Sequence, residues 1–379
     1  MTPLTYLAVD SVRTGPGVTQ VLPYVNEIAR LGRHVELHTF EPEPGEPGLP
    51  LADGIDWHAH PFGSLGSRGG AARMMKMAQL TRGRPLLHAR GNTAGTAAAI
   101  GRPVRWVWDM RAFWRAQRIA LGSMRHGSAE HRILGRLEHT AGRTADHIIV
   151  LNHASRAVLE ERHGSEVVGR TSTIPTCVDL SRFTMDGSPG TSPVQALLQG
   201  SINRLYDVPL MLAFVDELRA LRPTELRVVR PDPGVWEDQL QAAADVVERR
   251  APAEMPEAVR HSSLGLCVLA PGNPLSSAGV YPTKAAEFLA SGRPVVVDAN
   301  AGDVAVDVLA ARAGVVVDGP DSLGLAAQRL IELLDDPQLP ARCRDLAERR
   351  FDVRAAAKAL HEIYTGIEES DVESLSSMA

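Results

Sequence analysis

The chain has 379 residues, of which 44% are hydrophobic, and it carries a formal net charge of −5. This acidic balance, with arginines scattered along the chain, argues against a nucleic-acid-binding protein. We find no apolar run of about 18 residues, which argues against an integral membrane segment, and no N-terminal signal, which argues against export. Three distant cysteines without a CxxC pair exclude a disulfide framework or a structural zinc site and favour a cytoplasmic location.

The first half of the chain alternates short apolar runs with helical patterns, which is typical of a parallel sheet built from strand-helix-strand units. Its candidate strands cover residues 4–10, 34–40, 85–90, 104–111 and 146–152. Helices are predicted at 19–32, 71–82 and 128–145, with the segment 93–101 between two of the strands. Residues 41–54 are rich in proline, glycine and acid, so we expect a loop there.

A second series of the same kind follows. Its candidate strands cover residues 194–200, 226–231, 264–270, 293–299 and 313–318, and its helices cover 208–221, 235–248, 283–291 and 322–336. Two such halves predict an α/β protein with two Rossmann-like domains. The segment 173–193 is rich in proline, glycine and serine and should contain the join.

These patterns set the expected domain limits. The N-terminal domain is expected over residues 1–175, a linker over 176–193, the C-terminal domain over 194–350, a terminal helix crossing back to the first domain over 351–368, and a disordered polar tail over 369–379. Open sheets of this type bind ligands at the carboxyl ends of their strands, so the two domains are expected to face each other across a cleft.

A glycine-rich turn lies between the first strand and the first helix. Gly15 and Gly17 would let the backbone approach an anion, and the helix that follows would supply free amides and a partial positive charge. The pattern is not the GxGxxG of dinucleotide enzymes. A plain turn is therefore an equally good interpretation.

Two pairs of charged residues lie at the ends of predicted elements, one at the end of a strand and one at the start of a helix. Asp109 and Arg111 lie at the end of an apolar strand, where we expect them to face the cleft, although a local ion pair that orders the next loop would explain them too. Lys284 and Glu287 share one face of the helix predicted at 283–291. The alternative for Glu287 is a helix-capping role.

Five segments, the glycine-rich first turn among them, occur in the order and spacing of one enzyme family. "YPTKAAEFLASGRPVVV" resembles the S-P-T-K, two residues, E-Y-L-A, G-x-P-V-V segment of retaining GT-B glycosyltransferases, and "WDMRAFW" resembles their D-M-R-G-F-W. "IPTCVDLSRF" resembles I-P-N-G-V-D-x-x-x-F, and "QGSINRLYDVPLMLAF" resembles the G-S and W-Y opening of the second domain. Across almost its whole length the chain thus resembles glycogen synthase-like and phosphatidylinositol mannosyltransferase-like enzymes, of the glycosyltransferase family 4 type.

The resemblance implies roles for individual residues. Glu287 matches the glutamate that hydrogen-bonds the two ribose hydroxyls of the nucleotide, and Lys284 matches a lysine that meets the diphosphate. Gly17 corresponds to the glycine whose backbone approaches the phosphates. Backbone amides at the start of the same helix would join the phosphate site, those of Thr283, Ala285 and Ala286.

The sequence also departs from the family pattern. Gly279 stands where many relatives have a second glutamate for the donor sugar. Ser201 and Asp207 replace an arginine and a lysine, so phosphate charge must be met otherwise, and Arg204 is the nearest candidate, unless it is an ordinary surface arginine. Asp109 takes the place of a histidine near the donor sugar.

The resemblance therefore implies a GT-B enzyme that transfers a sugar from a nucleoside diphosphate donor, expected to be a UDP-sugar, to an acceptor hydroxyl with retention of configuration. The predicted catalytic residues are Asp109, Arg111 and Lys284, and the predicted donor-binding residues are Gly17, Arg204, Thr283, Lys284, Ala285 and Glu287. No acidic metal motif follows a strand, so we expect neither a metal ion nor another cofactor. The acceptor is expected to be a small molecule or a glycan, in bacterial antibiotic or cell-envelope biosynthesis.

Two other functions remain open at this stage. A nucleotide-sugar epimerase of GT-B shape would need no acceptor, and a sugar-nucleotide-binding protein without catalysis would be consistent with the loss of two basic residues at Ser201 and Asp207. Incubation with labelled donor alone would separate them.

Overall fold

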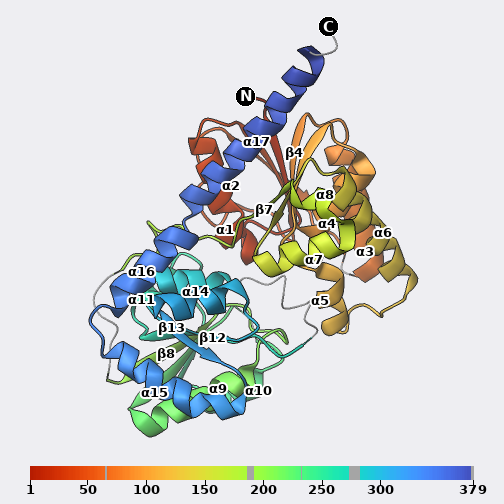
Figure 1. Ribbon diagram of the computed structural model, residues 1–379. Coiled ribbons are helices and arrows are strands. Elements are labelled where there is room, and N and C mark those ends of the chain that lie inside the picture. Colours follow the sequence, from red (N-terminus) through yellow and green to blue (C-terminus); the bar gives the residue numbers. More distant parts are fainter. Residues whose placement is uncertain (65, 186–191, 232, 273–281, 377–379) are drawn as a thin grey trace. The chain divides into compact units, whose positions relative to one another are not determined.

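The computed structural model describes residues 1–64, 66–185, 192–231, 233–272 and 282–376. The chain divides into two compact units (Figure 1). Unit 1 comprises Met1–Ile174 together with Val353–Ala379, and unit 2 comprises Pro175–Asp352. The last helix of the chain, α17 (Val353–Ser376), thus groups with the first unit.

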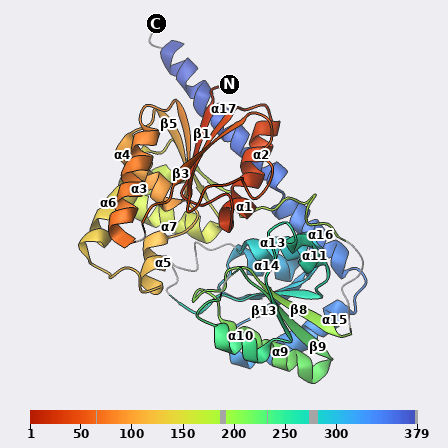
Figure 2. The ribbon, with the colours of Figure 1, turned by 180° about the vertical axis from the view of Figure 1, so that it is seen from behind.

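Over the described residues of unit 1, seven parallel strands form one sheet in the order β3-β2-β1-β4-β5-β6-β7. Its strands are β1 (Leu4–Ala8), β2 (Val35–Glu41), β3 (Ile55–Pro61), β4 (Leu86–Arg90), β5 (Arg105–Asp109), β6 (His147–Val150) and β7 (Thr171–Thr173). Its helices before α17 are α1 (Pro16–Gln20), α2 (Leu22–Arg30), α3 (Gly66–Thr81), α4 (Gly91–Gly101), α5 (Trp114–Ala120), α6 (Ala129–Thr144), α7 (His153–His163) and α8 (Ser165–Val168). Helices α2 and α17 lie on one side of the sheet, with α3, α4 and α6 on the other (Figure 2). The central strands are therefore buried on both faces, which explains their nearly continuous apolar runs.

Where unit 2 is described, its sheet has six parallel strands in the order β10-β9-β8-β11-β12-β13. They are β8 (Val194–Gln199), β9 (Thr224–Val229), β10 (Val246–Glu248), β11 (Leu264–Cys267), β12 (Val295–Asp298) and β13 (Gly314–Val317). The helices are α9 (Val208–Leu221), α10 (Glu237–Ala243), α11 (Met255–Arg260), α13 (Thr283–Ala290), α14 (Asp303–Ala311), α15 (Leu323–Leu334) and α16 (Leu339–Arg350), with a short 3-10 helix at Pro320–Ser322. The predicted α/β class, with two parallel sheets, is confirmed.

Helix α17 is held in unit 1 by packing and by an ion pair. It packs along α2, and its Glu368 receives two hydrogen bonds from Arg33, at 3.0 and 2.9 Å. The Arg33 side chain is fully buried. Burial raises the pKa of Glu368, but the hydrogen bonds from Arg33 and Thr2 outweigh it and set the pKa at about 2. The pair therefore stays ionised and fixes the last helix against the first unit.

Several elements differ from the predictions. Strand β3 was not predicted, because aspartate and histidines interrupt its apolar residues at the edge of the sheet. Residues 246–248 form the edge strand β10 although a helix was predicted over 235–248, and β-branched valines favour that outcome. Helix α17 continues to Ser376, into the segment 369–379 for which a disordered tail was predicted, since no proline or glycine follows Gly366 to end it.

No described helix combines the length and the apolarity needed to cross a membrane.

Candidate functional site

The first turn of α13 places a lysine against the loop that follows β8. Lys284 Nζ lies 3.8 Å from the centroid of the Tyr206 ring and 3.4 Å from the carbonyl oxygen of Ser201. Gly200 has a φ of +80°, and a Cβ on it would lie 3.1 Å from Lys284 Cε, so the close approach favours glycine. No carboxylate of the described chain forms an ion pair with this ammonium group. Its positive charge is therefore held in place by a ring and a carbonyl and remains available to an anion.

One turn later, Glu287 lies in a nearly closed environment. Its residue is 7% exposed, and Gln199 Nε2 donates a 2.7 Å hydrogen bond to Oε2. The other carboxyl oxygen, Oε1, accepts no hydrogen bond from the described residues. Burial raises the pKa of Glu287 to about 7, against the opposing effects of Lys284, Arg182 and the Gln199 amide. Glu287 does not cap α13, which begins after Pro282 without a side-chain cap, so the capping alternative is wrong.

Gln199 and Tyr206 were not predicted as site residues. Gln199 ends strand β8 beside Glu287, and its Oε1 is buried without a hydrogen-bond partner among the described residues. A buried amide oxygen without a partner costs free energy that a ligand hydroxyl would recover. The signal in the sequence was a polar amide at the carboxyl end of an otherwise apolar strand. Tyr206 carried no signal beyond its match to a family aromatic residue.

The other predicted donor-binding residues of unit 2 lie at the start of α13 or in the loop between β8 and α9. Ala285 was predicted to offer its backbone amide to an anion. Instead, Ala285 N donates a hydrogen bond to the Pro282 carbonyl oxygen at 3.1 Å. Thr283 is the first residue of α13 and is half-buried. Arg204 is exposed and forms no hydrogen bond or ion pair within the described residues. Gly279 lies outside the described residues.

Asp207, which stands where relatives have a lysine, has a structural role. Its Oδ1 accepts a 3.0 Å hydrogen bond from Leu210 N and caps the N-terminus of α9. The departure from the family pattern thus coincides with a conventional helix cap.

In unit 1, Gly17 is required by packing. It lies in α1, and a Cβ on it would fall 2.0 Å from the Ser11 carbonyl oxygen in the loop after β1. Any other residue would push α1 away from that loop. This requirement explains Gly17 without a ligand, and its predicted role in donor binding stays a prediction.

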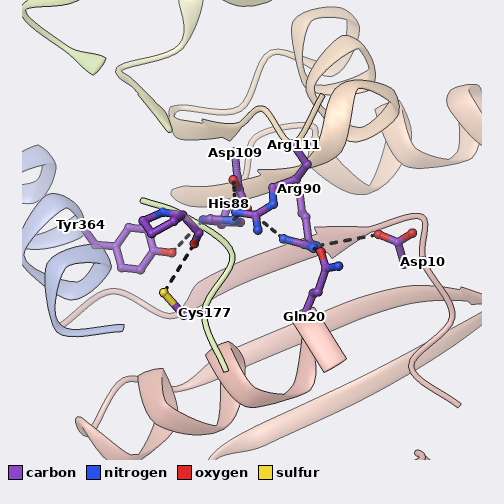
Figure 3. A network of polar contacts seen from close by, with 9 residues as sticks. Asp10, Gln20, His88, Arg90, Asp109, Arg111, Cys177 and Tyr364 are labelled. Carbon is purple, nitrogen blue, oxygen red and sulfur yellow. Dashed lines mark hydrogen bonds and ion pairs between the residues drawn. The ribbon is translucent and has the colours of Figure 1, made fainter. Parts of the chain in front are cut away.

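Asp109 and Arg111 belong to a buried charged network at the carboxyl ends of β4 and β5 (Figure 3). Asp109 Oδ2 lies 3.2 Å from Arg90 Nη1 and 3.4 Å from His88 Nε2, while Oδ1 lies 3.3 Å from Arg111 Nη1. Asp109 is 4% exposed and forms ion pairs with Arg90 and Arg111, as the ion-pair alternative expected, and its predicted role at a cleft stays a prediction. Burial raises its pKa, but Arg111, the His88 hydrogen bond and Arg90 outweigh burial and hold the pKa well below its ordinary value.

The network continues through Arg90 to the first helix and the first strand. Arg90 Nη2 donates a 2.7 Å hydrogen bond to Gln20 Oε1 on α1, and Arg90 Nε lies 3.8 Å from Asp10 Oδ2 after β1. Arg90 therefore joins two carboxylates, those of Asp10 and Asp109 (Figure 3). The negative charges of these two carboxylates compensate the cost of burying the Arg90 guanidinium group.

His88 connects this network to α17. Its Nδ1 lies 2.8 Å from Tyr364 Oη, and its ring stacks on that of Tyr6 with 4.3 Å between centroids. Burial lowers the pKa of His88 despite the hydrogen bond to Asp109, so the imidazole is neutral at pH 7. A neutral ring that donates from Nε2 to Asp109 must accept at Nδ1, so Tyr364 is the donor. Tyr364 thereby fixes the tautomer of His88.

The structure thus assembles the predicted residues into two groups, one in each unit. Lys284 and Glu287 meet Gln199 and Tyr206 in unit 2, and the network around Asp109 occupies unit 1. Within the described ranges, histidine, cysteine, aspartate and glutamate side chains form no group of three that could hold a metal ion.

No protein-family model matches the sequence, and no curated protein matches it. Solved structures do match. Sucrose-phosphate synthase from Thermosynechococcus elongatus is 17% identical, with a TM-score of 0.73 over 98% of this chain and 100% of that one. WaaG, a glycosyltransferase involved in lipopolysaccharide biosynthesis, is 16% identical, with a TM-score of 0.68 over 96% and 100%. Anabaena HepE in complex with UDP-glucose is 16% identical, with a TM-score of 0.64 over 98% and 100%. The chain therefore has the GT-B fold.

Proposed function

We propose that the protein is a retaining glycosyltransferase, of the family 4 type, that uses a nucleoside diphosphate sugar as donor. The observation that carries the proposal is the placement of Lys284 and Glu287 three residues apart on α13, in a chain with the GT-B fold. HepE, whose solved structure contains UDP-glucose, supports a UDP-sugar donor.

The two residues would recognise different parts of the nucleotide. The ammonium group of Lys284 has no carboxylate partner within the described chain and would meet the diphosphate. Glu287 Oε1 and Gln199 Oε1 both lack a protein donor among the described residues, and the two ribose hydroxyls would supply one each. Ribose binding would then satisfy Gln199 Oε1, which is buried without a partner among the described residues.

The reaction itself requires mainly stabilisation of the leaving group. The acceptor oxygen forms a bond to the anomeric carbon, and the bond between that carbon and the phosphate oxygen breaks on the same face. The acceptor proton passes to the departing phosphate oxygen, which leaves as the nucleoside diphosphate. Lys284 would oppose the negative charge that grows on this oxygen, so the proposed step needs no metal ion and no protein nucleophile.

Asp109 would contribute by position. Because it is buried and bonded to Arg90, Arg111 and His88, we propose that it holds the two guanidinium groups in place rather than touching the sugar. The role of the enzyme in the cell would be glycosylation of a small molecule or glycan in the bacterial cytoplasm.

Thermal denaturation with UDP, GDP and dTDP tests the proposal. A nucleotide at about 100 times its dissociation constant stabilises the folded protein by about 2.7 kcal/mol. We expect UDP to raise the melting temperature, and Glu287→Ala to abolish most of that rise, while the exposed control Glu217→Ala keeps it. If no nucleoside diphosphate changes the melting temperature, the proposal is wrong. Conversion of labelled donor without acceptor would instead indicate an epimerase.

A further inference from the structure

Unit 1 contains a large cavity at the carboxyl ends of its first four strands. Its volume is about 1010 Å³, at the upper end of the range for small-molecule sites. Residues after β1 and β3, one residue of β2 and the start of α4 line it from the sheet, and α3, α5 and α6 contribute the remaining wall. The wall is largely apolar, with aromatic rings from Phe40, Phe62 and Trp114 and leucines from α6.

Both arginines in this wall already have hydrogen-bond partners. Arg118 Nη1 donates a 2.6 Å hydrogen bond to Glu130 and its guanidinium group lies 4.9 Å from the Trp114 ring centroid. Arg73 donates to the carbonyl oxygens of Phe62 and Ser64, at 2.8 Å each. Such groups offer a ligand little unused hydrogen-bonding capacity. A sugar in this cavity would leave many hydroxyls without partners, which is costly.

Of the two carboxylates in the wall, Glu130 is bonded to Arg118, and Asp10 is the one with unused hydrogen-bonding capacity. Its carboxylate accepts no hydrogen bond from the described residues, and its side chain is 35% exposed. The nearest cation is Arg90, whose Nε lies 3.8 Å from Oδ2 and whose Nη1 contacts Asp109. The apolar cavity therefore has one acidic edge, directly connected to the charged network of Figure 3.

We propose that this cavity binds a compound with a large apolar body and places a hydroxyl of that compound beside Asp10. The apolar wall excludes water from the body, and Asp10 accepts a hydrogen bond from the hydroxyl. The body is an aromatic ring system or an acyl chain, which share this chemistry.

The compound is the acceptor of the transfer, a step that rests on the proposed function. Its hydroxyl oxygen then forms the bond to the anomeric carbon and its proton leaves with the nucleoside diphosphate. The acceptor is thus an apolar hydroxylated molecule and not a glycan.

Binding measurements with three probes test the cavity. The probes are 2-naphthol, 1-decanol and cellobiose, and binding is followed by calorimetry on the full chain. Two variants place a charge in the wall, Ile133→Arg and Met74→Arg. Their matched controls are Val104→Arg and Met75→Arg, at exposed apolar residues outside the wall.

We expect 2-naphthol or 1-decanol to bind, and the preferred probe identifies the body as aromatic or acyl. Each wall variant should weaken that binding about tenfold or more, because a charge cannot be desolvated cheaply, while each control changes it less than about twofold. Ile133 is 55% exposed, so its substitution should not unfold the chain, which the unchanged melting temperature would show.

Binding of cellobiose alone, or equal loss in wall and control variants, would overturn the inference. UDP binding, measured in parallel, separates this failure from that of the proposed function. If neither 2-naphthol nor 1-decanol binds while UDP still binds, the cavity proposal is refuted and the proposed function is not. If 2-naphthol binds but no nucleoside diphosphate does, the proposed binding of an apolar compound in the cavity is supported and the transfer reaction is refuted.

Discussion

Replacing Glu287 by glutamine tests the electrostatics of the nucleotide site. Burial raises the pKa of this carboxyl from 4.5 to about 7 in the folded chain. Because the folded-state pKa lies above the unfolded value, the folded state keeps the proton to higher pH, and ionisation costs folding free energy. The difference between about 7 and 4.5, at about 1.4 kcal/mol for each pH unit, gives a loss of about 3 kcal/mol. Stability is therefore lost as the pH rises from 4.5 to 7 and stays low above 7.

The Glu287→Gln variant has the same shape and no charge at any pH. It should exceed the wild type in stability by less than about 1 kcal/mol at pH 5 and by up to about 3 kcal/mol at pH 8. Calorimetric melting between pH 5 and 8.5 measures the difference, with the exposed Glu217→Gln as control. The variant should also bind UDP more weakly by about 1.5 to 3 kcal/mol, since it lacks a charged acceptor. Parallel stability curves for both proteins would show that Glu287 is already ionised and that the burial argument fails.

Other substitutions separate the remaining roles. Lys284→Ala should lower kcat by about 10²- to 10³-fold with little change in melting temperature, and near-normal kcat with a lower melting temperature would refute the phosphate role. Asp109→Asn should lower turnover much more than UDP affinity, and full activity would make the network purely structural. Glu368→Gln should cost about 1.5 to 3 kcal/mol of stability at pH 7, in urea unfolding, because Arg33 stays buried. This loss should shrink as the pH falls from 4.5 towards about 2, where wild-type Glu368 is also protonated. Activity should survive EDTA, and rescue by magnesium after its loss would contradict the metal-free mechanism.

The sequence predicted the parts of the fold that depend on local pattern. Central strands such as β1 and β12 are buried on both faces and read as apolar runs, and α13 follows from its spacing and flanking residues. Of the four edge strands in the described sheets, β13 was predicted, but β3, β7 and β10 were missed, because the residues of an edge strand need not be apolar. Strand β3 alternates apolar residues with aspartate and histidine, and β10 has three residues.

For the candidate site, too, only the residues that belong to a local pattern could be predicted. Motif order located Lys284 and Glu287, which lie three residues apart. Their partners could not be found locally, because Gln199 is 88 residues from Glu287 and Tyr364 is 276 residues from His88. Burial of Asp109 also depends on neighbouring strands, and a charged residue at a strand end gives no sign of whether two arginines will cover it.

The assignment of α17 to unit 1 has a consequence for the order of synthesis. All seven strands of the first sheet have been made once residue 173 is added, yet Arg33 then has no carboxylate to pair with and His88 lacks the hydroxyl that sets its tautomer. Both partners lie on α17, which follows unit 2 in the chain. All residues of unit 2, which ends at Asp352, precede α17, so unit 2 is synthesised in full before unit 1 has received its last helix. The first half of the protein to be translated is the last to be finished.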